Sequence, residues 1–165
     1  MRRGFYVLAW KYQEQHPLST YAIANRLVPF SFITAETALS FHNLIPERIT
    51  TTISMAAFGR NYKMNTNCGY FAYHVAPIKP SFFYYGVQVI KENDLLIYMA
   101  TPLRALMDYV YFHKIKNADV NFLLHSLRIE MDDIEKITRK EITVLRNVYQ
   151  SRYVMQFLQN LMDEL

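Results

Sequence analysis

Five histidines, one cysteine and two groups of acids are the side chains of this sequence best suited to chemistry. The histidines stand at positions 16, 42, 74, 113 and 125, and no two of them have the spacing of a metal-binding pair. His42 falls on the apolar stripe of an expected helix, so we expect a hydrogen-bonded core histidine rather than a catalytic one. Cys68 is expected to be an unreactive thiol in a turn. We therefore predict no metal and no other cofactor.

The acids that stand closest together are Glu92-Asn-Asp94 and Asp132-Asp133-Ile-Glu135. Carboxylates hold the magnesium ions of nucleases, but the first group is typical of a hairpin turn and the second of a helix start. A metal-dependent nuclease is therefore the less favoured alternative. The chain has four glycines, and it contains neither a phosphate-binding glycine fingerprint nor a serine nucleophile elbow. We predict no catalytic residue and a protein that is not an enzyme.

Positive charge and aromatic rings are concentrated in the first part of the chain. Residues 1–90 hold eight Lys or Arg, three acids and 17 of the 25 aromatic residues, whereas residues 91–165 hold ten Lys or Arg and eleven acids. Phosphates attract cations and bases stack on rings, so a basic nucleic-acid-binding module without catalysis is one alternative function. A strand-rich core with solvated surface charges has the same composition, and no helix-turn-helix, zinc finger or RNA-recognition motif is present. The candidate nucleic-acid-binding residues are Arg2, Arg3, Arg60, Lys63, Arg139, Lys140, Arg146 and Arg152.

The length of 165 residues and a hydrophobic share of 52% predict a single domain with its own core. The apolar stretch 4–10 ends at Lys11, which makes it too short for a signal sequence or a membrane span. We expect a soluble cytoplasmic protein that makes no use of a membrane. No pattern in the sequence indicates an oligomeric state.

Residues 1–100 are rich in strand patterns, and residues 101–165 have helix patterns throughout. Short β-branched and aromatic runs bounded by Asn, Gly and Pro predict strands, two pairs of which form hairpins, over residues 4–10, 49–57, 61–66, 69–75, 82–90 and 95–100. Capping residues such as Ser19 and Thr34, together with apolar spacings of three and four, predict helices over residues 19–28, 34–42, 102–114, 117–128, 138–149 and 154–165. Tyr149 belongs to the apolar face expected for residues 138–149. The order of these elements predicts an α+β fold, with a mainly antiparallel sheet and a C-terminal helical layer packed on it.

Two helical positions admit two interpretations. Arg104 and Asp108 are four residues apart on the helix that starts at Pro102. They form either a solvent-exposed pair of small energetic value or a polar contact that docks the helix on the sheet.

Thr138-Arg-Lys-Glu141 has the pattern of a capping box, in which the hydroxyl and the carboxylate each bond a free amide at the helix start.

Three stretches, in order along the chain, carry a family resemblance. Residues 3–8 read RGFYVL, residues 33–47 read ITAETALSFHNLIPE and residues 100–108 read ATPLRALMD. The second is similar to a signature S-A-L-x-x-H-G-L-I-P-E, with Asn43 in place of the glycine. The third is similar to A-x-P-E-K-A-L-L-D, with Leu103-Arg104 in place of Glu-Lys. Together they resemble the AbiEi family of antitoxins, through Gly4, Tyr6, Ala38, Leu39, His42, Pro46, Glu47, Pro102, Arg104 and Asp108.

This resemblance implies a function that the residues alone do not. Members of the AbiEi family are the antitoxins and transcriptional regulators of type IV toxin–antitoxin systems, which serve in abortive infection. The functional partner is a nucleotidyltransferase-like toxin, which the antitoxin opposes without a stable complex. The matching stretches follow the family's N-terminal winged helix, so we expect this chain to be the C-terminal domain without it. The resemblance assigns the matching residues a structural role and leaves DNA binding to the basic surface.

Overall fold

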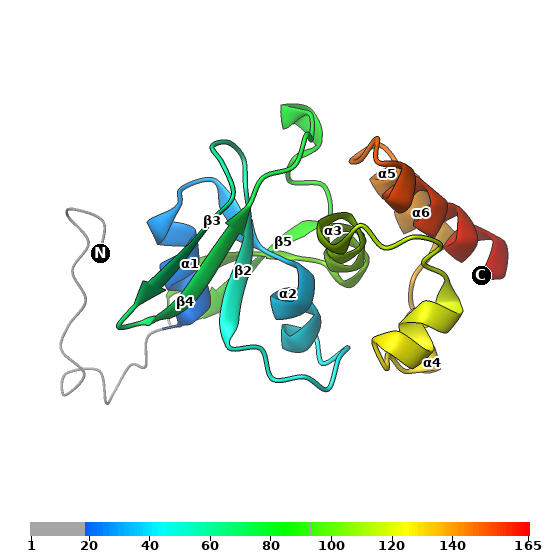
Figure 1. Ribbon diagram of the computed structural model, residues 1–165, viewed down its shortest axis with the longest axis horizontal. Coiled ribbons are helices and arrows are strands. Elements are labelled where there is room, and N and C mark those ends of the chain that lie inside the picture. Colours follow the sequence, from blue (N-terminus) through cyan, green and yellow to red (C-terminus); the bar gives the residue numbers. More distant parts are fainter. Residues whose placement is uncertain (1–18, 93) are drawn as a thin grey trace.

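A computed structural model of the chain describes residues 19–92 and 94–165 (Figure 1). The strand expected at residues 4–10 lies outside this range. Helix α1, Thr20–Leu27, begins where the sequence indicates, because the Ser19 hydroxyl accepts a hydrogen bond from the Ala22 amide at 3.4 Å. Strand β1, Ser31–Ile33, follows it and is buried along its whole length. A three-residue strand buried on both faces marks the centre of the fold.

The described strands form a six-stranded mixed sheet in the order β3-β4-β2-β1-β6-β5. Three neighbouring pairs are antiparallel, whereas β1 with β6 and β2 with β4 run parallel. The hairpins β3-β4 and β5-β6 are those that the sequence predicts. The remaining strands are β2 (Thr51–Ala56), β3 (Tyr62–Thr66), β4 (Gly69–His74), β5 (Val87–Glu92) and β6 (Leu95–Ala100).

Side chains replace strand pairing on both sides of β1, which is too short to pair with the full length of its neighbours. Helix α2, Ala35–Phe41, follows β1, and its Thr37 hydroxyl donates to the Thr51 carbonyl at 3.0 Å and accepts from the Ile53 amide at 2.9 Å. On the other side, Asn25 accepts from the Tyr98 amide at 2.8 Å through Oδ1 and donates to the Ser31 carbonyl through Nδ2. These two side chains form hydrogen bonds with backbone groups that would otherwise lack a partner on a neighbouring strand.

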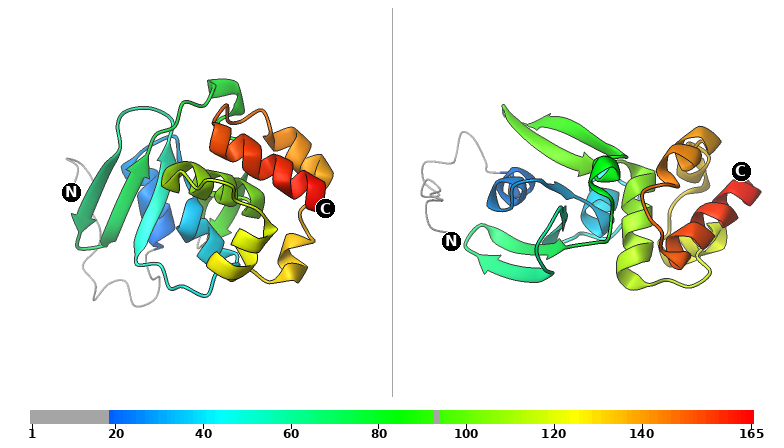
Figure 2. Two further views of the ribbon diagram at one scale, coloured as in Figure 1. Left: turned by 45° about the vertical axis from the view of Figure 1, so that its right-hand side comes forward. Right: turned by 90° about the horizontal axis from the view of Figure 1, so that it is seen from above.

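The sheet consequently divides into two arms that meet only at β1. One arm holds β2, β3 and β4, the other holds β5 and β6, and α1 lies between them (Figure 2). Helix α2 continues from β1 and packs against β2 and β6. Helix α3, Pro102–His113, packs on α2 and separates the sheet from the C-terminal helices (Figure 1).

The α+β class expected from the sequence is confirmed, with the helical elements concentrated after residue 100. Beyond α3 the chain forms a π-helical turn η3 (Phe122–Ser126), α4 (Met131–Ile134), α5 (Arg139–Leu145) and α6 (Arg152–Glu164). Helices α5 and α6 pack on α3, and the apolar face expected for α6 is buried there through Val154, Phe157, Leu158 and Leu161. None of the helices in the described ranges has the length and apolar character needed to cross a membrane.

Three sequence expectations are wrong in detail. The strand expected at 82–90 starts only at Val87, because Pro80–Phe82 forms a 3-10 turn (η2) and Gly86 has a φ of 69°. The helix expected at 117–128 is reduced to a short helical segment, because both of its end residues have left-handed φ angles. In the expected capping box, Thr138 accepts from the Glu141 amide at 3.2 Å, but the Glu141 carboxylate instead lies 3.5 Å from the Thr101 hydroxyl.

Asn43, which stands where the AbiEi signature has glycine, has a φ of 58°. The left-handed region is costly for most residues, whereas glycine adopts it freely and asparagine adopts it more readily than the others. The residue closes the end of α2, where its amide donates to the Ser40 carbonyl at 3.0 Å. The substitution relative to the signature therefore keeps the backbone geometry that a glycine would provide.

We predict that Asn43→Ala lowers the free energy of unfolding by about 1 kcal/mol relative to Asn43→Gly, because alanine must adopt the left-handed conformation without a polar side chain. Urea denaturation of both variants measures the difference. The matched control is exposed Asn147, which does not have a positive φ. There alanine should be no worse than glycine, and an equal effect at both positions would contradict the prediction.

Candidate functional site

The Arg104–Asp108 pair is fully buried and lies at the centre of a polar network. The Arg104 Nε donates to Asp108 Oδ1 at 2.9 Å, and both side chains have zero exposed area. The sequence left open a surface pair or a contact that docks helix α3. The burial and the partners described below confirm the second interpretation.

Asp108 accepts hydrogen bonds from two further elements. The Thr34 hydroxyl, at the end of β1, donates to Oδ2 at 2.5 Å, and the Tyr149 hydroxyl, after α5, donates to Oδ1 at 2.7 Å. Burial and the Asp108 carboxylate raise the pKa of the Tyr149 hydroxyl well above its ordinary value, so it remains protonated and donates. Because Thr34 bonds Asp108, its side chain does not cap α2 as the sequence suggested. One carboxylate thus holds the end of β1, α3 and the segment before α6.

Arg104 binds the segment that leads into β5. Its Nη1 donates to the Phe83 carbonyl at 3.1 Å and to the Tyr85 carbonyl at 2.5 Å. The guanidinium carbon lies 4.9 Å from the centre of the Phe32 ring, which is close enough for a cation–π contact. Nη2 has no hydrogen-bond partner among the described residues. The two carbonyls and the ring fix the position of a charge that would otherwise be costly to bury.

Gly86 permits this close approach of α3 to the segment before β5. A Cβ at this position would lie 2.8 Å from Arg104 Cβ and 3.0 Å from Leu145 Cδ2. The Gly86 carbonyl accepts the Thr101 amide at 2.8 Å directly before α3 begins. Any larger residue would push α3 away from the strand, in addition to being strained at a φ of 69°.

His42, at the end of α2, contacts both strands of the β5-β6 hairpin. Its Nε2 lies 2.8 Å from the Ala100 carbonyl, at the end of β6, and 3.4 Å from the Gln88 amide nitrogen. The carbonyl can only accept, so the Ala100 contact requires the proton on Nε2. The hydrogen bond expected for His42 is present, but the expected core position is wrong, because the side chain is half-buried.

The other residues of the family resemblance have separate positions. Ala38 and Leu39 are buried in the core, and Pro102 occupies the first turn of α3. Pro46 and Glu47 are exposed, and Glu47 forms an ion pair with Arg128. Gly4 and Tyr6 lie outside the described residues. The second and third matching stretches therefore meet in one scaffold.

The structure distributes the predicted nucleic-acid-binding residues over two groups. Arg60 precedes β3 and Lys63 lies in it, whereas Arg139 and Lys140 begin α5, Arg146 follows its last residue and Arg152 begins α6. All six are exposed. Arg2 and Arg3 lie outside the described residues. Strand β3 and helix α5 lie toward opposite sides of the molecule, so these residues do not form one continuous basic patch (Figure 1).

The two acid groups that a nuclease would need are also separate. Asp94 pairs with Lys91 at 2.7 Å in the β5-β6 turn, and Asp133 pairs with Lys136 at 2.6 Å at α4. The turn and α4 lie at opposite ends of the molecule (Figure 2). Within residues 19–92 and 94–165, no three His, Cys, Asp or Glu side chains form a group able to hold a metal ion.

A second cluster of ionisable side chains joins α2, α3 and β4. His113 Nε2 lies 2.7 Å from Glu36 Oε1, and Glu36 Oε2 is buried without a partner among the described residues. The His74 ring stacks on Phe112, with 4.3 Å between ring centres. Burial lowers the pKa of His74 below its ordinary value, Glu36 opposes this shift, and Lys63 and His113 add to it.

A polar cavity of about 360 Å³ opens beside His74. It lies where the end of β4, the end of α3 and the start of α6 meet. The side chains around it include an amide, an imidazole, hydroxyls and one cation, with no carboxylate among them. The lining residues are Asn61, His74, Val75, Tyr111, Phe112, Lys114, Ser151 and Tyr153.

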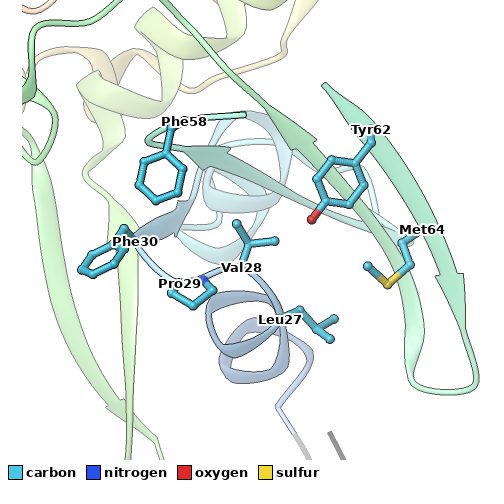
Figure 3. Close-up of a pocket in the computed structure, with 7 residues that line it drawn as sticks. All are labelled: Leu27, Val28, Pro29, Phe30, Phe58, Tyr62 and Met64. Carbon is cyan, nitrogen blue, oxygen red and sulfur yellow. The ribbon is translucent and has the colours of Figure 1, made fainter. Parts of the chain in front are cut away.

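An apolar groove of about 690 Å³ lies between the end of α1 and strand β3 (Figure 3). Phe30 and Phe58 stand at its rim with 65% and 68% of their areas exposed, and their ring centres are 6.2 Å apart. Phe30 has a left-handed φ of 61°, which is unfavourable for a bulky residue. The Tyr62 ring and the Met64 thioether form the opposite wall (Figure 3).

Sequence reasoning missed four contributors to the central network. The sequence predicts Thr34 as a helix cap and Tyr149 as part of an apolar face, and it indicates no role for Gly86 or for the Tyr85 carbonyl. A glycine between aromatic residues and a strand is a signal that could have indicated the close approach. The tyrosine hydroxyl and the carbonyl carry no comparable signal in the sequence.

Neither protein-family models nor curated proteins give a match to this chain. The AbiEi resemblance therefore remains a prediction from the three stretches.

We predict that Asp108→Asn destabilises the protein by about 3–5 kcal/mol, because it leaves the Arg104 charge buried without its counter-ion. Urea denaturation measures the loss. Tyr149→Phe, which removes one hydrogen bond and keeps the ring, should cost about 1–3 kcal/mol and tests the network even if Asp108→Asn fails to fold. Asp133→Asn, in an exposed pair, is the matched control and should leave the urea midpoint unchanged. Equal effects at positions 108 and 133 would contradict the buried-pair interpretation.

We predict that His74 makes the protein less stable in mild acid. Because its folded-state pKa lies below the unfolded value of 6.5, the unfolded chain binds the proton first as the pH falls. The stability associated with neutral His74 is therefore complete above pH 6.5 and is lost as the pH falls toward the folded-state pKa. Unfolding free energies at several pH values should fall less steeply for His74→Gln than for wild type. His125→Gln, at an exposed site, should keep the wild-type slope, and the reverse order would refute the prediction.

Proposed function

We propose that this chain is the core of a non-enzymatic antitoxin and transcriptional regulator of a type IV toxin–antitoxin system, opposing a nucleotidyltransferase-like toxin. The observation that carries the proposal is the meeting of two matching stretches, 33–47 and 100–108, in one buried scaffold. Asp108 bonds Thr34, and His42 bonds Ala100, so residues of one stretch are direct partners of residues of the other. Such residues have a structural reason to occur together.

The roles of the matching residues support a scaffold rather than a reactive centre. Arg104 and Asp108 are fully buried and engaged with carbonyls, hydroxyls and rings, which leaves no solvent path for a substrate to reach them. Asn43 has the backbone conformation that a glycine in the signature would favour. These features support a protein that acts through its exposed surface.

Co-expression with a nucleotidyltransferase-like toxin encoded beside this chain tests the proposal, because such a neighbour is what the antitoxin function requires. The folded chain should restore growth that the toxin inhibits, and no stable complex is needed for this result. Asp133→Asn, at an exposed pair, should restore growth as wild type does, whereas Asp108→Asn should not, because it disrupts the scaffold. Inhibition that persists at full expression of folded wild-type protein would reject the antitoxin function.

A basic nucleic-acid-binding module without catalysis is the second candidate. It is favoured by the exposure of all six described candidate cations: Arg60, Lys63, Arg139, Lys140, Arg146 and Arg152. Binding through phosphate contacts should weaken steeply as salt rises, because each neutralised phosphate releases counter-ions. Binding to duplex DNA that is insensitive to salt, or absent at low salt, would exclude it.

A further inference from the structure

We propose that the cavity between β4, α3 and α6 is a binding site for a nucleotide. This inference does not depend on the antitoxin function. The cavity volume of about 360 Å³ lies at the lower end of the range for ligand pockets, roughly 300–1,000 Å³, and suits one nucleotide. Its walls come from three parts of the chain that are far apart in the sequence, so it is a product of the fold.

The charge around the cavity favours an anion. Lys114 is the only formally charged residue among its lining residues, and no described carboxylate pairs with it. The charge of Lys63 lowers the pKa of the His74 imidazole, which lines the cavity. Arg152 stands in the sequence between two lining residues, Ser151 and Tyr153. The carboxylate that acts on His74, Glu36, does not line the cavity and is bonded to His113. A phosphate would therefore meet the Lys114 cation without a competing acid in the wall.

The cavity also offers hydrogen-bond donors with defined positions. Asn61 Oδ1 accepts the Val75 amide at 2.8 Å, which fixes the side chain and leaves its Nδ2 as a donor. The Ser151 hydroxyl makes no capping bond to α6, so it too is available. Phosphate oxygens accept several such bonds at once, and they bind best where donors and a cation converge.

Aromatic rings distinguish this cavity from a simple phosphate site. His74, Tyr111, Phe112 and Tyr153 all contribute to its lining, and His74 already stacks on Phe112 with an angle of 23° between the ring planes. Bases stack on such rings in proteins that bind single-stranded nucleic acid. The combination of a cation, donors and rings fits the phosphate and the base of one nucleotide.

Titration calorimetry of the full chain with adenosine monophosphate tests the site. Inorganic phosphate and adenosine are the partial probes, and each should bind more weakly than the complete nucleotide. Lys114→Gln should weaken nucleotide binding about tenfold, because a charge-assisted hydrogen bond is lost. Lys116→Gln, at an exposed position outside the cavity, is the matched control and should bind as wild type does.

Imidazole proton resonances provide a readout that does not rely on the variants. The His74 signals should shift on addition of the nucleotide, whereas those of exposed His125 should not. A single-stranded pentanucleotide that binds more tightly than the mononucleotide would assign the site to a nucleic-acid strand, and equal binding would assign it to a free nucleotide. Unshifted His74 signals at millimolar nucleotide, equal effects of the two lysine variants, or equal affinity for inorganic phosphate would overturn the proposal.

Discussion

The buried ion pair of Arg104 and Asp108 constrains the arrangement of the whole molecule. Two charges with no exposed area are costly to bury, and here partners from the end of β1, from the segment before β5 and from Tyr149 offset this cost. The sheet, α3 and the C-terminal helices are therefore held in a fixed relation by a polar interaction within an otherwise apolar core.

The short central strand explains why the buried polar network around Arg104 and Asp108 is needed. With three residues, β1 cannot hold two sheet arms together by strand pairing alone, so Thr37 and Asn25 supply additional bonds to β2 and β6. The same division leaves space for α1 between the arms and places α2 against α3 (Figure 2). Thr34, at the junction of β1 and α2, then joins the short strand β1 to Asp108 in α3.

The surfaces available for function lie away from this centre. The apolar groove at Phe30 and Phe58 lies on the arm that contains β3, and the polar cavity at His74 lies where that arm meets the helices. Their linings differ in kind, one mostly apolar and the other with a cation, hydroxyls and rings. A fold by itself does not define a function, and these two surfaces are where partners of different chemistry would be recognised.

Local patterns in the sequence determined most of the elements but not the contacts between them. The Ser19 cap, both hairpins, the start of α3 at Pro102 and the apolar face of α6 follow from short-range rules, because caps, turns and periodicity act within a few residues. The sequence also located Arg104 and Asp108 but left their burial undecided. Tertiary structure alone decided that they meet Thr34 and Tyr149, because hydrogen bonds between residues 74 and 41 positions apart leave no local pattern. The cavity at His74 exists for the same reason: its walls become neighbours only after the chain has folded.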